Sequence, residues 1–228
     1  MKTQDPTRRR TPLSRERVLR AAIALADERG AQELTMRKLA KELGVEAMSL
    51  YNHVANKDDL LDGMIDIVFG EIEAPVAGGD WKAELRKRAV STRAALNRHR
   101  WAIGEMEGRS SHGPNNLRVH DAVLGCLRAA GFSIEMTVHG MSVQDAYIYG
   151  FALQQSDMSS ETPDDFAAEA QRQMRDYAAA LADYPHLVEV VGGYVATAGY
   201  DYETEFLFGL DVILDRLEQL LGQADGEG

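Results

Sequence analysis

The chain has 228 residues, 45% of them hydrophobic, which is enough for one large or two small domains, and its net charge of −11 argues against a uniformly basic, nucleic-acid-coating protein. The charge is uneven, because residues 1–60 hold twelve Lys and Arg against nine Asp and Glu, whereas the remainder holds thirteen against twenty-seven. This asymmetry is consistent with DNA binding at one end only, and also with a solvated acidic surface plus a basic tail.

Residues 1–13 contain Asp5-Pro6, three consecutive arginines and Pro12, and we expect a disordered basic arm there. Such an arm can contact phosphates or enter a minor groove, and the alternative is a flexible tail with no contact. An amphipathic helix follows and ends at Gly30. Its apolar face comprises Val18, Ala21, Ala22, Leu25 and Ala26.

Residues 34–61 carry the most specific pattern in the chain. Thr35 is a favourable N-cap for a short amphipathic helix, and Gly44 follows it where a left-handed residue is expected. A second helix fits residues 47–53, with Leu50 and Val54 buried, and Asn56 can cap a third helix. Two helices joined by a glycine turn predict a helix-turn-helix, although an ordinary surface hairpin of helices has the same spacing.

The rest of the chain keeps a helical period, with no alternating strand pattern and no internal repeat. Glycine and proline clusters separate the segments, as at Gly78-Gly79, 104–114 and 159–163. Residues 189–200 have a strand-like composition, and we expect a loop there. The further helices are expected at 57–74, 81–99, from the 104–114 break to Ala130, 134–157, 164–181 and 202–221.

The segment 34–61 resembles the DNA-binding domain of the TetR (tetracycline repressor) family. The matching motifs are Leu34-Thr35-x-Arg37-x-Leu39-Ala40, Leu43-Gly44-Val45, Leu50-Tyr51-x-His53-Val54 and Asn56-Lys57-x-x-Leu60-Leu61. The resemblance implies that Ala47, Met48 and Ser49 open the recognition helix and face the DNA groove. It also implies phosphate or edge-base contacts for Thr35 and Arg37, and phosphate contacts for Tyr51, His53 and Lys57.

Hydroxyls and cations are suitable phosphate partners, so these residue types fit those roles. Ala47 and Met48 offer no strong hydrogen bonds, and part of the readout is therefore expected to be apolar contact with thymine methyls. The alternative for Tyr51 is a core aromatic residue, and for His53 an ordinary surface histidine.

Two later segments, Ala130-Gly131-Phe132-Ser133 and Phe206-Leu207-Phe208-Gly209-Leu210, resemble the tetracycline-repressor type of C-terminal domain. In that group the corresponding helices form a four-helix bundle between two subunits, and a two-fold dimer reads half-sites about 34–36 Å apart or a multiple of that. A helix that is buried in the core of a single chain also has two apolar faces, so the alternative is that these are core helices. The interface implied comprises Val138, Met141, Asp145, Ile148, Ala152, Phe206, Leu210, Ile213, Leu214 and Leu217.

C-terminal domains of this family bind a small molecule and then lose DNA affinity, and the helix from Lys57 is the expected lever. The metal-chelating histidine of the tetracycline repressors falls at Met106, so a tetracycline–magnesium complex is not expected as the effector. We place an effector pocket for an unknown small molecule at Arg88, Thr92, Trp101, Met106, His120, Tyr147 and Phe151. Any of these side chains can instead fill the core.

Enzyme classes find little support in the sequence. The six histidines show no His-Glu-x-x-His spacing, and there is no Gly-x-Ser-x-Gly elbow or phosphate-binding glycine loop, so we expect no metal and no cofactor. Cys126, the single cysteine, lies among leucines and is interpreted as core filler in a reducing cytoplasm. No apolar run reaches the roughly 18–20 residues of a membrane span, and no apolar signal segment begins the chain.

The sequence therefore predicts an all-α, cytoplasmic, homodimeric DNA-binding regulator, most simply a repressor released from a palindromic operator by a small molecule. The alternatives are a ligand-independent DNA-binding protein and, with less support, a helical enzyme. The length of residues 81–200 argues against the former, because dimerisation alone would not need that segment. The expected parts are a basic arm (1–13), a three-helix helix-turn-helix domain (14–60), a helical effector-binding and dimerisation domain (61–222) and a disordered tail (223–228).

Overall fold

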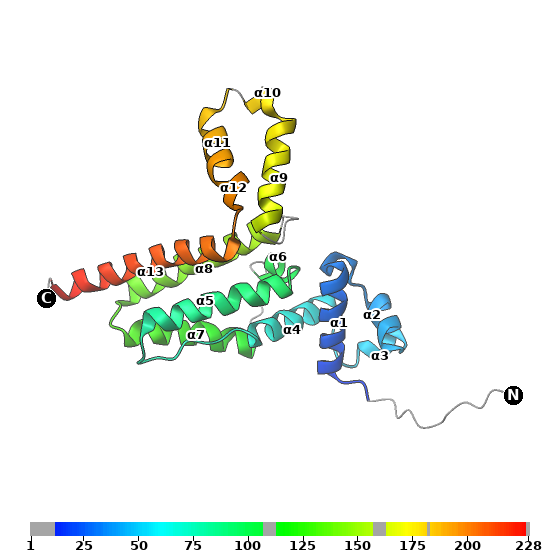
Figure 1. The fold of residues 1–228 in the computed structure, drawn as a ribbon. Coiled ribbons are helices and arrows are strands. Elements are labelled where there is room, and N and C mark those ends of the chain that lie inside the picture. Colours follow the sequence, from blue (N-terminus) through cyan, green and yellow to red (C-terminus); the bar gives the residue numbers. More distant parts are fainter. Residues whose placement is uncertain (1–11, 107–112, 157–162, 182, 227–228) are drawn as a thin grey trace. The chain divides into compact units, whose positions relative to one another are not determined.

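A computed structural model describes residues 12–106, 113–156, 163–181 and 183–226, and within these ranges the chain is helical with no strand (Figure 1). The all-α prediction is thus confirmed. The chain divides into two compact units, Met1–Glu73 with Ala94–Asp121, and Ala74–Arg93 with Ala122–Gly228. Among the described helices, none combines the length and the apolar character needed to cross a membrane.

The first unit begins with four helices and a 3-10 turn. They are α1 (Arg15–Arg29), η1 (Ala31–Glu33), α2 (Met36–Leu43), α3 (Ala47–Leu50) and α4 (Lys57–Gly70). Side chains cap three of these helices. Thr35 accepts from Lys38 N at α2 and Asn56 accepts from Asp59 N at α4, as predicted, and Ser14 accepts from Arg17 N at α1. Each cap satisfies a backbone donor that has no partner within its helix.

One continuous apolar core joins α1 to α4. Burying such side chains contributes about 1.5–3 kcal/mol each for the larger ones, so this core holds the short helices α2 and α3, which would not be stable alone. Its fully buried members include Val18, Ala22, Leu34, Leu39, Leu50, Val54, Leu60 and Met64.

The first unit is completed by the end of α5 (Trp81–Arg98), by α6 (Ala102–Met106) and by the first half of α7 (Pro114–Ala129). Asp66 on α4 accepts hydrogen bonds from Asn115 N at 2.8 Å and from Asn116 N at 3.1 Å. A carboxylate on α4 therefore satisfies two free backbone donors in the first turn of α7 and ties these helices together.

The second unit packs the first part of α5 and the end of α7 against α8 (Ile134–Ser156) and α13 (Tyr202–Gly226). On α8 the buried face comprises Thr137, Gly140, Gln144, Ile148, Phe151 and Ala152. On α13 it comprises Phe206, Leu210, Leu214 and Leu217. Gly209 on α13 leaves room for the side chain of Tyr147 on α8, since a β-carbon at this position would overlap the Tyr147 ring and hydroxyl.

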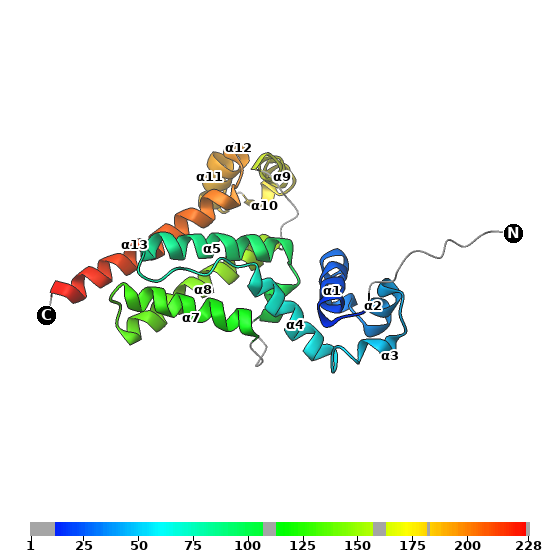
Figure 2. The ribbon, with the colours of Figure 1, turned by 90° about the horizontal axis from the view of Figure 1, so that it is seen from below.

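A helical hairpin lies between α8 and α13 in the chain. Its outgoing arm is α9 (Pro163–Asp176) followed by α10 (Ala178–Leu181), and its returning arm is α11 (Pro185–Val190), a π-helical turn (Val191–Val195) and α12 (Ala196–Ala198). Both views show α9 beside α12 (Figures 1 and 2). Gln171 on α9 donates to the carbonyl of Ala196 at 2.6 Å, which fixes that pairing.

Several element boundaries differ from those expected. The prediction of a loop at 189–200 is wrong, because this stretch continues α11 through the π-helical turn into α12. The break expected at 104–114 begins later, since α6 forms over Ala102–Met106. The recognition helix, expected over 47–53, ends at Leu50 and is followed by turns to His53, and α4, expected to reach residue 74, ends at Gly70. The helix expected at 164–181 is divided near Tyr177, and α13 continues to Gly226 rather than ending at Leu221.

Candidate nucleic-acid interface

Gly44 sets the angle between α2 and α3. Its dihedral angles of φ 65° and ψ 37° are left-handed, and its N–H bonds back to the end of α2. Val45 N then donates to the carbonyl of Ala40 at 3.0 Å, so the chain leaves α2 through a compact C-terminal cap. The helix-turn-helix predicted from the sequence is present with the predicted glycine at its turn.

The recognition helix α3 has one side buried in the core and another side exposed. Leu50 and Val54 are buried, as expected. Met48 is 74% exposed and Tyr51 is 45% exposed, whereas Ala47 and Ser49 are half-buried at its start. The exposure of Tyr51 disfavours its alternative role as a core aromatic residue.

The remaining predicted contact residues are accessible at the edges of this motif. Thr35, Arg37 and Lys57 are exposed and His53 is half-buried. The hydroxyl of Thr35 is used as the α2 cap. Arg37 and Lys57 have no ion-pair partner among the described residues, which leaves their charges available for phosphates.

A polar cluster fixes the turn between α3 and α4. Arg15 on α1 donates to both carboxylate oxygens of Asp59, at 2.6 and 2.9 Å, and to the carbonyl of His53 at 2.9 Å. Asp59 also accepts from Ala55 N at 2.7 Å. The hydrogen bonds from Arg15 and from Ala55 outweigh the effect of burial, and the pKa of Asp59 lies below its ordinary value.

Two of the predicted effector residues of the first unit, Trp101 and His120, already form hydrogen bonds within that unit. Trp101 donates its indole N–H to Asp27 at 2.7 Å, and His120 Nδ1 lies 2.8 Å from the carbonyl of Asn116 with its ring beside Phe69. Met106 is half-buried.

The predicted effector residues of the second unit lie in two places. Arg88 is 1% exposed, forms an ion pair with Asp145 at 2.6 Å and donates to Gln144 at 3.1 Å. Thr92 is fully buried and donates to the carbonyl of Arg88.

Tyr147 and Phe151 belong to an aromatic cluster instead. Tyr147 stacks on Phe206 at 5.5 Å, Phe151 meets the same ring edge-on at 5.2 Å, and the guanidinium of Arg93 lies 5.0 Å from its centre. Burial raises the pKa of Tyr147 to about 12, so its hydroxyl is protonated and donates to the carbonyl of Phe206.

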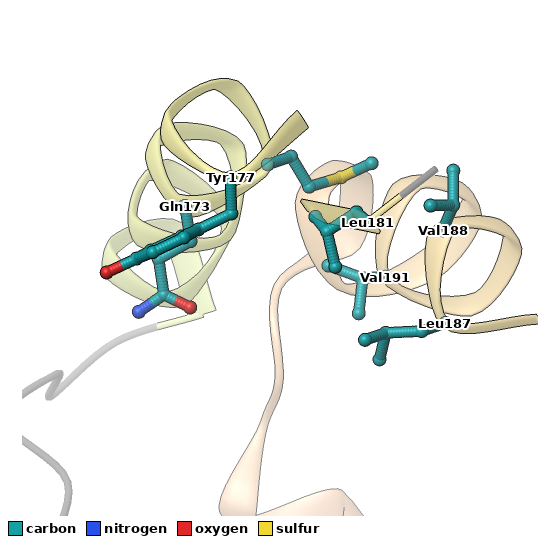
Figure 3. Close-up of a pocket in the computed structure, with 7 residues that line it drawn as sticks. Gln173, Tyr177, Leu181, Leu187, Val188 and Val191 are labelled. Carbon is teal, nitrogen blue, oxygen red and sulfur yellow. The ribbon is translucent and has the colours of Figure 1, made fainter. Parts of the chain in front are cut away.

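An apolar pocket lies elsewhere in the second unit, within the helical hairpin (Figure 3). The sequence interpretation missed it, because residues 189–200 were expected to be a loop. It is lined by Gln173, Met174, Tyr177, Leu181, Leu187, Val188 and Val191.

The predicted interface residues divide into two sets within the second unit. Ile148, Ala152, Phe206, Leu210, Leu214 and Leu217 are buried within the single chain. Val138 is exposed, and Met141, Asp145 and Ile213 are half-buried. Other apolar side chains are well exposed on the same two helices: Val143 and Leu153 on α8, and Phe208 and Val212 on α13.

Comparisons with known proteins agree with this arrangement. Residues 18–64 match the model of bacterial regulatory proteins of the tetR family, and residues 74–221 match the tetracyclin repressor-like C-terminal domain. The chain is 34% identical to the HTH-type transcriptional repressor DrrR1 of Streptomyces coeruleorubidus, over 94% of this chain and 81% of the relative.

Two further relatives extend the likeness. The class D tetracycline repressor protein of Escherichia coli is 34% identical over 68% of this chain and 72% of its own length. The crystal structure of ActR from Streptomyces coelicolor in complex with actinorhodin superposes with a TM-score of 0.76 and 29% identity, over 93% of this chain and 100% of the other. The chain belongs to the TetR family of bacterial regulatory proteins, and it is a DNA-binding transcriptional regulator rather than an enzyme.

Proposed function

We propose that this chain acts as a homodimer that occupies a palindromic operator and leaves it when a small molecule binds. The observation that carries the proposal is the helix-turn-helix of the first unit. Met48 is exposed on α3, and Arg37 and Lys57, on either side of α3 in the chain, form no ion pair within the part of the chain that the structure describes. Phosphate contacts fix the register of such a motif on DNA, and contacts to base edges provide sequence preference.

Dimerisation is supported by the outer surfaces of α8 and α13. Phe208 is 69% exposed and Val212 is 54% exposed, and their spacing of four residues places them on one face of α13. Val138 and Leu153 are exposed on α8. Exposed apolar side chains on helices that pack together are a common mark of a protein interface, and these four residues are better candidates than those already buried within one chain.

A small-molecule effector is supported by the relatives. ActR has been crystallised in complex with actinorhodin, and a TetR of Acinetobacter baumannii in complex with minocycline. We place the effector in the second unit, most of which falls within the match to the C-terminal family domain over residues 74–221. The aromatic cluster around Tyr147 and Phe151 is the candidate contact there, because the hydroxyl of Thr92 is already used on the carbonyl of Arg88 and the guanidinium of Arg88 is already paired with Asp145.

The DNA-binding part is tested by selecting an operator from a pool of random duplexes and comparing two variants on it. Lys57→Ala should weaken binding to all sequences alike and reduce the slope of log affinity against log salt by about one ion. Met48→Ala should change the order of preference among operators instead. Identical behaviour of the two variants would show that α3 is not the recognition helix.

Arg172→Ala is the matched control, because Arg172 is an exposed cation of the second unit that pairs with Glu169. It should leave both the salt dependence and the sequence preference unchanged. The effector part is tested by screening small molecules for a thermal shift and for release of the selected operator. A protein whose operator affinity no molecule alters would instead be the ligand-independent DNA-binding protein.

A further inference from the structure

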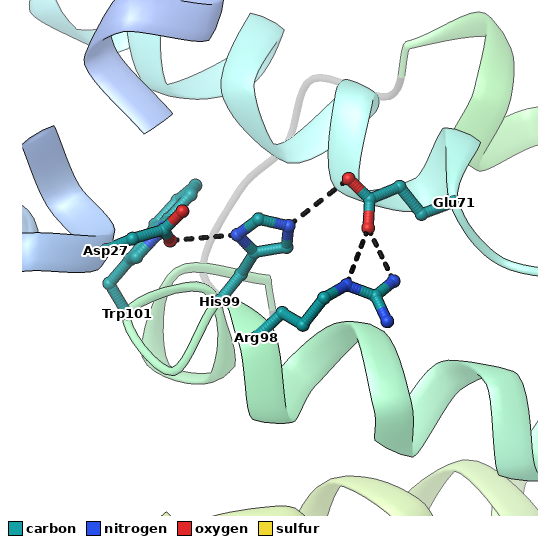
Figure 4. Close-up of polar contacts among 5 residues, drawn as sticks. All are labelled: Asp27, Glu71, Arg98, His99 and Trp101. Atoms are coloured by element: carbon teal, nitrogen blue, oxygen red, sulfur yellow. Dashed lines mark hydrogen bonds and ion pairs between the residues drawn. The ribbon is translucent and has the colours of Figure 1, made fainter. Parts of the chain in front are cut away.

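His99 lies between two carboxylates that come from different helices (Figure 4). Its Nδ1 is 2.8 Å from Asp27 Oδ1, on α1, and its Nε2 is 3.2 Å from Glu71 Oε1, directly after α4. The residue is 8% exposed. All three residues belong to the first unit, so this arrangement is internal to one compact body.

The remaining groups around the ring complete the cluster. Arg98, its neighbour in the chain, donates to the other oxygen of Glu71 at 2.6 Å, and Trp101 donates to Asp27 at 2.7 Å. Asp27 and Glu71 are therefore the anionic groups that face His99, and Arg98 is the cation beside it. Burial disfavours ionisation of Glu71, but its contacts with Arg98 and His99 outweigh burial and leave its pKa below the ordinary value.

The geometry distinguishes between the two charge states of the imidazole. A protonated ring donates from both nitrogens and satisfies both carboxylates at once. A neutral ring donates from one nitrogen only, and its other nitrogen then directs a lone pair at a carboxylate oxygen. The bridge between α1 and the end of α4 is thus complete only when His99 carries its second proton.

The two anchors of this bridge lie near the ends of two different helices of the first unit. Asp27 lies near the end of α1, which packs on α2 and α4 through the core described above. Glu71 lies at the opposite end of α4 from the turn that follows α3. A displacement of the end of α4 relative to α1 must stretch one of the two His99 contacts.

We propose that His99 is a positioning residue whose charge sets how tightly α1 is held to the end of α4, so that the operator affinity of this protein varies with pH through this side chain. The proposal rests on the operator binding proposed above. It assigns His99, Asp27 and Glu71 a regulatory role that is separate from DNA contact, because none of them lies on α2 or α3.

The test compares operator dissociation constants at about pH 6 and about pH 8, the range over which histidine changes charge, for the unaltered protein and His99→Gln. Glutamine keeps a polar side chain of similar reach but cannot carry the charge. The ratio of the two constants should differ between the proteins by about five- to tenfold, at the lower end of the usual range of coupling between sites. Equal ratios would overturn the proposal.

Asp27→Asn removes the charge of one anchor while keeping an oxygen that can accept from Trp101. The ratio of its operator dissociation constants at the two pH values should shift towards that of His99→Gln. A ratio equal to that of the unaltered protein would also count against the proposal. His186→Gln is the matched control, because His186 is a 95% exposed histidine beside Glu189 in the second unit and should leave the ratio unchanged. His53 is present in every protein compared, so it does not account for a difference between them.

Thermal unfolding of the DNA-free protein separates failure of this inference from failure of the proposed function. If no operator is bound at any pH, the proposed function fails. The bridge is then still tested by whether the difference in Tm between the unaltered protein and His99→Gln narrows from about pH 6 to about pH 8. A constant difference in Tm would reject the bridge itself.

Discussion

At the scale of single residues, sequence reasoning identified the groups whose partners are close in the chain. Thr35 and Asn56 cap their helices and Gly44 is left-handed, because each role is decided within three or four residues. Arg15 and His99 were not identified. Their partners, Asp59 and Asp27, lie 44 and 72 residues away, and no local pattern encodes a contact that only the packed helices create.

Asp59→Asn should destabilise the first unit, because it removes the charge that Arg15 binds and weakens the acceptor for Ala55 N. Both side chains are substantially exposed, at 45% for Arg15 and 33% for Asp59, so solvent screening limits the loss to about 1 kcal/mol in the free energy of unfolding. Urea unfolding at neutral pH measures it.

The pH dependence of that difference has a definite sign. The pKa of Asp59 is lowered in the folded protein, so its contribution is complete above the ordinary carboxyl pKa and is lost as the pH falls through the folded value. The gap in stability between the unaltered protein and Asp59→Asn should therefore be present at neutral pH and close in acid. A gap that widened in acid would mean that the Arg15 contact is not what lowers this pKa.

At the scale of elements, strongly periodic helices were predicted well and ambiguous ones were not. The helices α5, α8 and α13 begin at or within one residue of their expected starts, since caps and apolar spacing agree there. Residues 189–200 are rich in Val, Gly and Tyr, which disfavour an isolated helix. They become helical where they pack against α9 and the carbonyl of Ala196 accepts from Gln171, so tertiary packing overrides local preference.

The turn between α2 and α3 supports a prediction at the same scale. Gly44→Ala places a β-carbon on a left-handed residue and should cost about 1–2 kcal/mol in the free energy of unfolding. Asparagine tolerates this conformation, so Gly44→Asn should lose less stability and retain more operator affinity. Chemical denaturation and operator titration of both variants check this order. A larger loss for Gly44→Asn than for Gly44→Ala would mean that side-chain size, rather than the backbone angle, governs the turn.

At the scale of the whole molecule, the sequence indicated a DNA-binding domain followed by an effector-binding and dimerisation domain. The structure instead divides the chain into two units, each made of separate stretches. The unit that holds the helix-turn-helix also includes α4, the last turns of α5, α6 and the start of α7. Charge and periodicity could not show this, because the division depends on which helices pack together. The division also explains why the predicted effector residues fall into two groups.

The proposed dimer leads to the last prediction. Phe208→Asp places a charge in the middle of the exposed apolar face of α13, and burying an unpaired carboxylate between subunits would cost several kcal/mol. Light scattering should then show a monomer. A monomer binds one half-site with a single helix-turn-helix and loses the affinity gained when two subunits bind at once. Its affinity for the palindrome should therefore fall by about a hundredfold or more.

Val76→Asp is the matched control, since Val76 is 63% exposed but lies in the segment after α4 rather than on α8 or α13. It should remain dimeric and bind the palindrome normally. Binding of Phe208→Asp to an isolated half-site should match that of the unaltered protein, because the helix-turn-helix is intact. A Phe208→Asp protein that stayed dimeric would move the interface to another surface, and one that bound the palindrome at full strength as a monomer would remove the need for a dimer.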